Sequence, residues 1–345
     1  MKKMLAIVVA IIIALGGVLA GEPAQADQAD KVTQIIEKLA PGVLSQTSSA
    51  ELLNVAKQVL GSGKQGIRLN SISSDRKTQI SMTLAFASSI ESTSSGVSVL
   101  SGDDDAIHAD SQSTENGFRV LTTLTSSPKS NRFDFKFNVP MNLDVQASPN
   151  GYLVIAGSQV LGSVAKPWAI DGQGNALRTH FEWNGNGLTQ VLDENLSTIT
   201  YPVVMDPSWG YTKQYDLVFR ASTNMSRLQT CFNCYFPVEG APRGYPKFGQ
   251  LLPLKVSIFN FECTMGQTIQ TATYGSFQFN ATRNHIDGYG SNIIFQFIQV
   301  GSKNVLVVDA YIVNSLDFIR GIYEPAAALN WAKFASNLNS PTPRT

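Results

Sequence analysis

The densest group of reactive side chains lies in the segment 284–291, which reads Asn-His-Ile-Asp-Gly-Tyr-Gly-Ser. In a hydrolase, His285 would be the general base, Asp287 would orient it and Ser291 would be the nucleophile. Members of such a triad usually come from separate segments, so closeness in sequence does not show that they converge. Asp-Gly and Tyr-Gly-Ser are also typical of a turn between two strands of a hairpin. Both interpretations stay open, and the turn is the simpler one.

Asp309 is a second candidate, because it is a carboxylate within the apolar run 305–311. In a strand, alternation places it on the same face as Val305, Val307 and Tyr311. A carboxylate that faces a core needs a partner or has a raised pKa, which would mark a site. The natural partners are Arg283 or Arg320, and a structural ion pair is the favoured interpretation.

The three cysteines are Cys231, Cys234 and Cys263. In an exported protein they predict one disulfide and one free thiol. We expect the bond between Cys234 and Cys263, which would close a loop of about 30 residues and remove ~3–4 kcal/mol of unfolded-state entropy. Cys231–Cys263 and Cys231–Cys234 are the competing pairs. A zinc or redox site is disfavoured, because His285 is the only nearby histidine and no helical pattern follows Cys234.

Signals of other cofactors are weak. The acidic run 103–105, with His108 and Asp110 after it, lacks the spaced carboxylates and central glycine of a calcium loop, and a solvated loop is the better interpretation. The chain has no nucleophile elbow and no stripe of Lys and Arg between aromatics, and its basic and acidic residues are equal at 26 each. We therefore predict no metal, no cofactor and no nucleic-acid partner.

The start of the chain has the pattern of a secretory signal peptide. A short basic start precedes an apolar run from Leu5 to Ala20, and the segment 24–26 reads Ala-Gln-Ala, a small-x-small cleavage pattern. Cleavage after Ala26 would leave Asp27 as the mature N-terminus. No second long apolar stretch follows, so we expect a secreted, extracellular protein without a membrane span.

Periodicity predicts the elements of the first half. Helical spacing predicts a helix over 32–39, and a capping box at Ser48 and Glu51 predicts a second helix that reaches Leu60. From 67 to 209, short runs of alternating apolar and polar residues recur about every 8–12 residues, with turn residues between them. This spacing predicts an antiparallel β-sandwich-like module.

The segment 201–209, Tyr-Pro-Val-Val-Met-Asp-Pro-Ser-Trp, closes this module, with Ala-Lys-Pro-Trp-Ala at 165–169 and Gln-Val-Leu-Asp at 190–193 upstream. Together these segments resemble a module of secreted actinobacterial proteins. In those proteins a β-rich region ends in a Tyr-Pro-Val-x-x-Asp-Pro-x-Trp-like segment, and C-terminal regions of different kinds follow it. The resemblance covers Arg119 to Trp209. It implies secretion and a domain boundary near Trp209, and it assigns no activity.

The second half is rich in aromatic residues. We predict strands at 215–221, 252–259, 268–281, 292–299 and 305–313, then an amphipathic helix from Glu324-Pro325 to Leu338. The fold class is therefore mainly β, with two antiparallel β-sandwich-like domains, short N-terminal helices and a C-terminal amphipathic helix. The predicted division is a signal peptide (1–26), a helical segment (27–66), the sandwich-like module (67–209), an aromatic-rich β domain (210–340) and a tail (341–345).

The leading functional hypothesis is a secreted, non-catalytic binding or interaction protein of the cell envelope or exterior. Its partner would be a cell-wall glycan or an envelope protein. The hypothesis rests on the missing catalytic motifs. The alternative is a secreted hydrolase, or an effector or toxin carried in the C-terminal domain.

Overall fold

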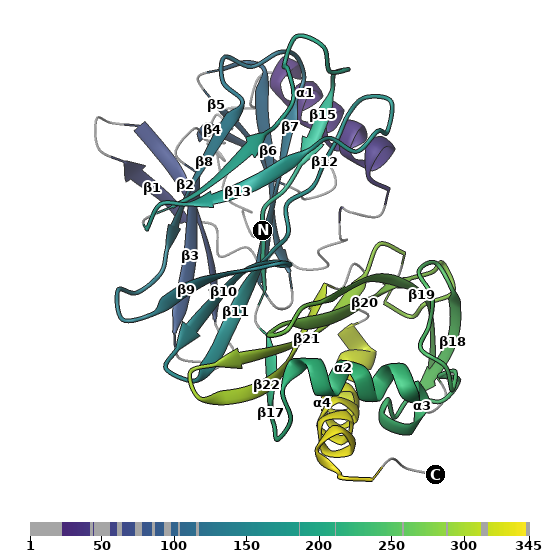
Figure 1. Cartoon of the computed structure of the whole chain (residues 1–345). Helices are drawn as coiled ribbons and strands as arrows, with labels where there is room; N and C mark the ends of the chain where they lie inside the picture. Colours follow the sequence, from purple (N-terminus) through teal and green to yellow (C-terminus); the bar gives the residue numbers. More distant parts are fainter. Residues whose placement is uncertain are drawn as a thin grey trace, which may run out of the picture.

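The computed structural model describes residues 23–41, 44, 56–60, 64–72, 78–84, 87–92, 98–102, 104–114, 117–185, 187–210, 212–256, 259–287, 289–311 and 317–342. The mainly β class and the C-terminal helix are confirmed. Two antiparallel sheets build the first half, and a third sheet with helices builds the second (Figure 1). Within the described residues, no helix is long and apolar enough to cross a membrane.

The first half is a sandwich of two antiparallel sheets. The smaller sheet has the order β1 (Ala56–Leu60), β2 (Lys64–Ile72), β3 (Gln79–Leu84), β8 (Arg132–Asn138), β14 (Leu188–Leu192) and β13 (Thr179–Trp183). The larger sheet has the order β4 (Ala87–Ser92), β5 (Ser98–Gly102), β6 (Ile107–Thr114), β7 (Gly117–Leu124), β16 (Ser208–Gly210), β11 (Gln159–Ala165), β10 (Gly151–Ala156) and β9 (Asp144–Ser148). In addition, β15 (Val203–Met205) pairs with β7 and with β12 (Ala169–Ile170).

Alternation of apolar and polar residues builds the sandwich core, as strand β8 illustrates. Its three phenylalanines are buried, and they alternate with the exposed Asp134 and Lys136. Across the sandwich, the ring of Phe137 contacts Phe118 and Trp209, with centroid separations of 6.3 and 5.4 Å. The period of two in the sequence therefore gives one face to the core and the other to solvent.

Helix α1 (Pro23–Leu39) covers the outer face of the larger sheet. Val32 and Ile36 are buried against Val99, Leu121 and Val204 of the sheet. The helix predicted over 32–39 is thus confirmed, and it has the packing surface that a short helix needs.

The second predicted helix is wrong where the structure describes it. Residues 56–60 form strand β1, which pairs antiparallel with β2 from Ala56↔Arg68 to Leu60↔Lys64. Ser48 and Glu51, which suggested the helix, lie outside the described residues. Local helix signals are a weak prior, and pairing with a neighbouring strand outweighs them here.

One antiparallel sheet forms the second half, in the order β17 (Lys213–Leu217), β22 (Lys303–Tyr311), β21 (Asn292–Val300), β20 (Gly275–Ala281), β19 (Phe259–Gln270) and β18 (Leu251–Val256). Helices α2 (Ala221–Thr230), α3 (Phe232–Tyr235) and α4 (Asp317–Asn339) cover one face of it (Figure 1). Met225, Phe232 and Phe334 from the helices are buried against Phe277 and Phe295 of the sheet. Helices therefore form the second layer of this half, whereas the sequence predicted a second sheet there.

The opposite face of this third sheet packs on the sandwich. Leu153, Ile155 and Val160 from β10 and β11 form one apolar cluster with Val305 and Val307 of β22. Among the described strands, none pairs from one half to the other, and the chain changes sheet between Gly210 and Lys213. Beyond the linking segment, side-chain packing joins the two halves, together with hydrogen bonds between the side chain of Gln214 in β17 and the backbone of Ser158 and Val160.

Several element boundaries differ from the predictions; the predicted strand at 215–221, for example, ends at Leu217, and Ala221 begins helix α2. The run 268–281 is the end of β19 and all of β20, separated by a turn in which Thr271 N donates to Tyr274 O at 2.7 Å. Helix α4 begins at Asp317, before the predicted start at Glu324-Pro325. Proline removes one helical hydrogen bond, but residues before it can still be helical.

Candidate functional site

A cavity of about 70 Å³ lies between helix α4 and the third sheet. Its walls are mostly apolar and include Phe236, Leu254, Phe261, Phe279 and Trp331. Polar groups reach it from the loop 282–291 and from Asn330 of α4. Apolar walls with a few placed polar groups are the usual composition of a ligand pocket.

The loop between β20 and β21 brings the sequence candidates to this pocket. His285, Asp287 and Ser291 all line it. The loop is held by backbone bonds from His285 N to Thr282 O and from Ile286 N to Asn260 O, both at 3.1 Å. Strands β20 and β21 are antiparallel neighbours, so the predicted turn between two hairpin strands is confirmed. The same turn also carries its polar groups to a cavity.

The imidazole of His285 is fixed by its own loop and by an aromatic neighbour. Its Nδ1 accepts the backbone N–H of Asp287 at 3.0 Å, so the neutral ring carries its proton on Nε2. The ring meets Phe261 edge-on, with a centroid separation of 5.2 Å. Burial disfavours the charged ring and lowers the pKa of His285 from 6.5 to about 4. At neutral pH, His285 is therefore an uncharged hydrogen-bond donor.

These three residues do not form a catalytic relay. Ser291 Oγ donates to the backbone carbonyl of Asp287 at 2.7 Å, and so its proton is directed at a carbonyl and not at a base. The carboxylate Oδ2 of Asp287 lies 3.7 Å from His285 Nδ1. A base and its partner work at hydrogen-bond distance, about 2.6–3.2 Å. The observed contacts order the loop, and they leave His285 Nε2–H with no acceptor among the described residues.

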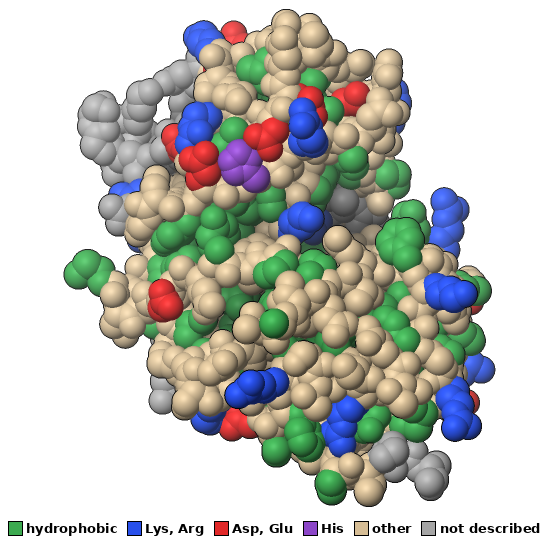
Figure 2. Space-filling view, viewed as in Figure 1, with side chains coloured by type: hydrophobic (Ala, Val, Ile, Leu, Met, Phe, Trp, Pro, Cys, Tyr) green, Lys and Arg blue, Asp and Glu red, His purple; other side chains and the backbone are tan. Residues whose placement is uncertain are grey.

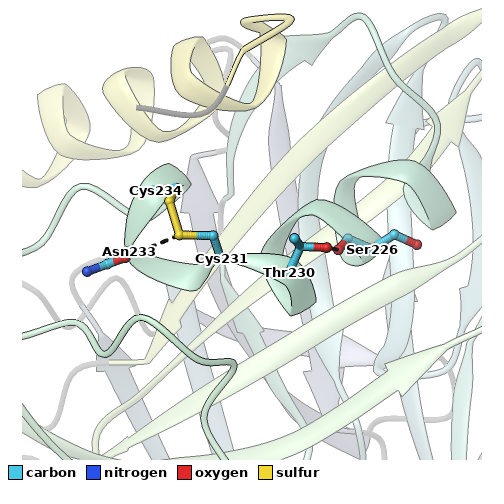
Figure 3. The surroundings of a disulfide bond; sticks show 5 residues. All are labelled: Ser226, Thr230, Cys231, Asn233 and Cys234. Carbon is cyan, nitrogen blue, oxygen red and sulfur yellow. Dashed lines mark hydrogen bonds between the residues drawn. A yellow bond between two sulfur atoms is a disulfide. The ribbon is translucent and has the colours of Figure 1, made fainter. Parts of the chain in front are cut away.

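The disulfide joins Cys231 to Cys234 (Figure 3), and Cys263 is the free cysteine. The predicted Cys234–Cys263 bond is therefore wrong, and one of its two competitors is correct. Cys231 lies between α2 and α3, and the turn of α3 brings the two Cα atoms to 5.4 Å, within the range of a disulfide. The sequence suggested a turn-rich segment here, and the helical turn is what makes the short bond possible.

Cys263 itself lines the pocket from strand β19. Burial, together with the charge of Glu262, raises the pKa of the Cys263 thiol to about 12. A thiol in this state is a small apolar wall group, because the thiolate is the nucleophilic and metal-binding form. Cys263 therefore adds no nucleophile to the pocket.

The disulfide turn positions one aromatic side of the pocket. Phe232 and Phe236 stack at a centroid separation of 5.0 Å across α3. Phe236 then contacts Phe279 at 5.5 Å and Trp331 at 6.0 Å, and both of these line the cavity. Asn233, between the cysteines, has its Oδ1 3.4 Å from Cys231 Sγ (Figure 3). The short bond thus fixes the turn from which Phe236 enters the pocket wall.

Asp309 lies where the two halves meet, and it does not reach the pocket. Ser163 of β11 donates a hydrogen bond to its Oδ2, and burial raises the pKa of Asp309 to about 6. Val305 and Val307, on whose face the sequence placed Asp309, are buried, and Asp309 itself is partly buried. The suggested ion pair with Arg283 does not form, because that guanidinium lies over the ring of Tyr289 at 5.8 Å. The side chain of Arg320, the other suggested partner, lies outside the described residues.

Arg119 of β7 makes a second polar link between the halves, which the sequence analysis missed. Its Nη1 donates to the hydroxyl of Tyr311 at 2.5 Å, and its guanidinium carbon lies 3.5 Å from the centre of that ring. Burial raises the pKa of the neighbouring Asp206 to about 6, against the opposing charge of Arg119. Asn150 adds a third link, because its Nδ2 donates to Tyr274 OH at 2.7 Å. No local pattern reveals such pairs, since more than a hundred residues separate the partners.

The acidic run near position 104 belongs to a turn. Asp104 accepts the backbone N–H of Ala106 at 3.1 Å and of Lys129 at 3.3 Å, and Asp103 lies outside the described residues. The solvated loop predicted to include His108 and Asp110 is wrong for these two residues, because both are buried in strand β6, where Nδ1 of His108 lies 3.0 Å from Ser101 Oγ. Within the described ranges, no cluster of three His, Cys, Asp or Glu side chains could hold a metal ion.

Figure 2 shows acidic and basic side chains around a histidine on the sandwich surface. His180 lies 2.9 Å from Asp193 and 3.4 Å from Glu182, and Glu182 also pairs with Arg132 at 2.5 Å. All four side chains are substantially exposed. Exposed pairs of this kind contribute little to stability and do not mark a site.

Comparison with protein-family models, with curated proteins and with solved structures found no match. The pocket between α4 and the third sheet is therefore the feature on which a functional argument rests.

Proposed function

We propose that the protein is an exported, non-catalytic binding protein that holds a small apolar group of an envelope ligand in the pocket beside α4. The observation that carries this proposal is the pocket itself. It combines aromatic walls with the neutral donor of His285, and the other two reactive groups of its loop are used in loop contacts. A cell-wall glycan is the proposed partner.

Two features support export. The sequence begins with the basic and apolar pattern of a signal peptide. The Cys231–Cys234 bond fits an oxidising compartment, where disulfides persist. If cleavage occurs after Ala26, the first turn of α1 is removed, and Val32 and Ile36 still anchor the helix on the sheet.

A hydrolase is the second candidate, and one observation favours it: His285, Asp287 and Ser291 line the same cavity. Its difficulty is the hydrogen bonding. The hydroxyl of Ser291 is directed at a backbone carbonyl, and the Nδ1 of His285 is occupied by a backbone amide. Binding without turnover requires no change in these contacts, whereas hydrolysis would require both to break.

Helix α4 offers a matched pair of variants for the test. Ala327 lines the cavity, and its neighbour Ala328 is not among the lining residues. Ala327→Leu adds about three methylene-sized groups to a cavity of about 70 Å³ and should fill it. Ala328→Leu makes the same change on the same helix without entering the pocket.

The experiment is cosedimentation of the purified mature protein with insoluble cell-wall glycan. We expect wild type and Ala328→Leu to pellet with the glycan, and Ala327→Leu to stay in the supernatant. Soluble sugars released during the incubation are measured in parallel. Release of wall fragments by the wild type, or equal pelleting of both variants, would contradict the proposal.

A further inference from the structure

We infer that the pocket recognises the acetamido group of an N-acetylated amino sugar; this inference rests on the proposed function and specifies its ligand. The juxtaposition that carries it is a small apolar cavity, a neutral hydrogen-bond donor at its edge and an exposed aromatic ring on the same loop. Each of these features selects a different part of the ligand.

The donor selects a hydrogen-bond acceptor on the ligand. Because Nδ1 of His285 is occupied by the amide of Asp287, the ring offers Nε2–H to whatever occupies the pocket. A carbonyl oxygen is a suitable acceptor. Asn330 of α4 also lines the cavity, and its side-chain carbonyl is a suitable acceptor for the amide N–H of the same group.

The size of the cavity limits the group that enters. An apolar cavity of roughly 150 Å³ holds a benzene ring of six carbons. The cavity beside α4, at about 70 Å³, therefore has room for about three heavy atoms. Its walls of Phe279, Trp331 and Ala281 suit a methyl group. A methyl attached to a carbonyl fits both the volume and the donor.

The charge of the site disfavours an ionised ligand group. The ring of His285 is neutral at physiological pH, and the carboxylate Oδ2 of Asp287 lies 3.7 Å from its Nδ1. Inside the cavity, a ligand carboxylate would lose its hydration against apolar walls, and no Lys or Arg is among the described residues that line it. An uncharged amide meets no such cost.

The ring of Tyr289 favours a sugar as the carrier of the acetamido group. Tyr289 follows Asp287 by two residues on the pocket loop, and its side chain is 52% exposed. The guanidinium of Arg283 lies 5.8 Å from the centre of this ring, and the exposed part of the ring offers contact to the C–H face of a pyranose outside the cavity. A linear acetylated peptide has no comparable flat face.

The test is calorimetric titration of the full mature protein with N,N′,N″-triacetylchitotriose and with cellotriose. The two sugars share one backbone and differ in having an acetamido or a hydroxyl group at C2. Burial of the methyl and formation of the hydrogen bond predict roughly ten- to hundredfold tighter binding of the acetylated sugar. Equal affinity for the two sugars overturns the inference, and it leaves the proposed function intact if wall glycan still pellets the protein.

Variants separate the donor from the cavity. His285→Phe keeps a ring and removes the donor, so it should weaken the acetylated sugar about three- to tenfold and leave cellotriose unchanged. Ala327→Leu, which keeps His285, should abolish the preference for the acetylated sugar and serves if the first variant does not fold. Tighter binding of an N-acetyl-lysine peptide than of the sugar overturns the inference. Failure to bind any of these ligands or wall glycan removes the proposed function as well.

Discussion

Asp309 allows a test of the contact between the two halves, because one substitution removes its charge and retains its hydrogen bond. In Asp309→Asn, the side-chain carbonyl can still accept the hydroxyl of Ser163. Burial raises the pKa of Asp309 from 3.8 to about 6, which corresponds to about 3 kcal/mol. The variant therefore isolates the cost of burying the ionised carboxylate.

The sign of the effect follows from linkage. The folded state holds the proton more tightly than the unfolded chain, so the stability that Asp309 contributes is full below pH ~4 and is lost as the pH rises through about 6. Asparagine does not titrate. Relative to the wild type, Asp309→Asn should have nearly equal stability at pH 4 and be more stable by up to about 3 kcal/mol at pH 8.

The assay is urea denaturation of wild type and variant at pH 4, 6 and 8, followed by tryptophan fluorescence and by circular dichroism. Asp144→Asn on strand β9 is the control, because that side chain is exposed. Its stability relative to the wild type should change little with pH. A stability difference for Asp309→Asn that does not depend on pH, or that favours the wild type at pH 8, would refute the assignment of Asp309 as a buried, ionisable contact.

Two further predictions concern the pocket. Burial lowers the pKa of His285 to about 4, so the free energy of unfolding of the wild type should fall by up to about 3 kcal/mol as the pH drops from 6.5 to 4. In the same urea titrations, His285→Phe should not show this loss. Parallel pH curves for the two proteins would contradict the prediction. Reduction of the Cys231–Cys234 bond should lower the free energy of unfolding by about 2 kcal/mol on the chain-entropy model, less than the loss expected for a disulfide that closes a long loop. The shift of the urea midpoint measures this loss. Non-reducing peptide mapping that finds Cys263 in a cross-linked peptide would refute the pairing.

Much of the strand content and the position of the candidate loop follow from the sequence. The phenylalanines of β8 alternate with exposed charged residues. This period of two in the sequence predicts a strand, because successive side chains of a strand point to opposite faces, here the core and the solvent. The loop containing His285 was predictable as a turn, since Asp-Gly and Tyr-Gly-Ser favour turns. The same loop was also identifiable as a candidate functional site, because several reactive side chains lie close together in its sequence.

Other features depend on contacts that residue types and their spacing do not display. Residues 56–60 form a strand because β2 pairs with them, and the capping pattern upstream of them does not reveal this pairing. The cysteine pairing depends on the helical turn of α3, and the spacing of the sequence alone left three pairs open. Tyr311 meets Arg119 across 192 positions, so no local pattern identifies that contact. Pairing and packing in three dimensions supply this information, and a single sequence does not display it.

A crystal structure of the mature protein with soluble N-acetylated wall-glycan fragments tests the central claim most directly. We predict an intact fragment whose acetamido group lies in the cavity beside α4, with its carbonyl within hydrogen-bond distance of His285 Nε2 and its methyl against Trp331. A fragment bound elsewhere on the molecule, or cleaved in the pocket, would contradict the account.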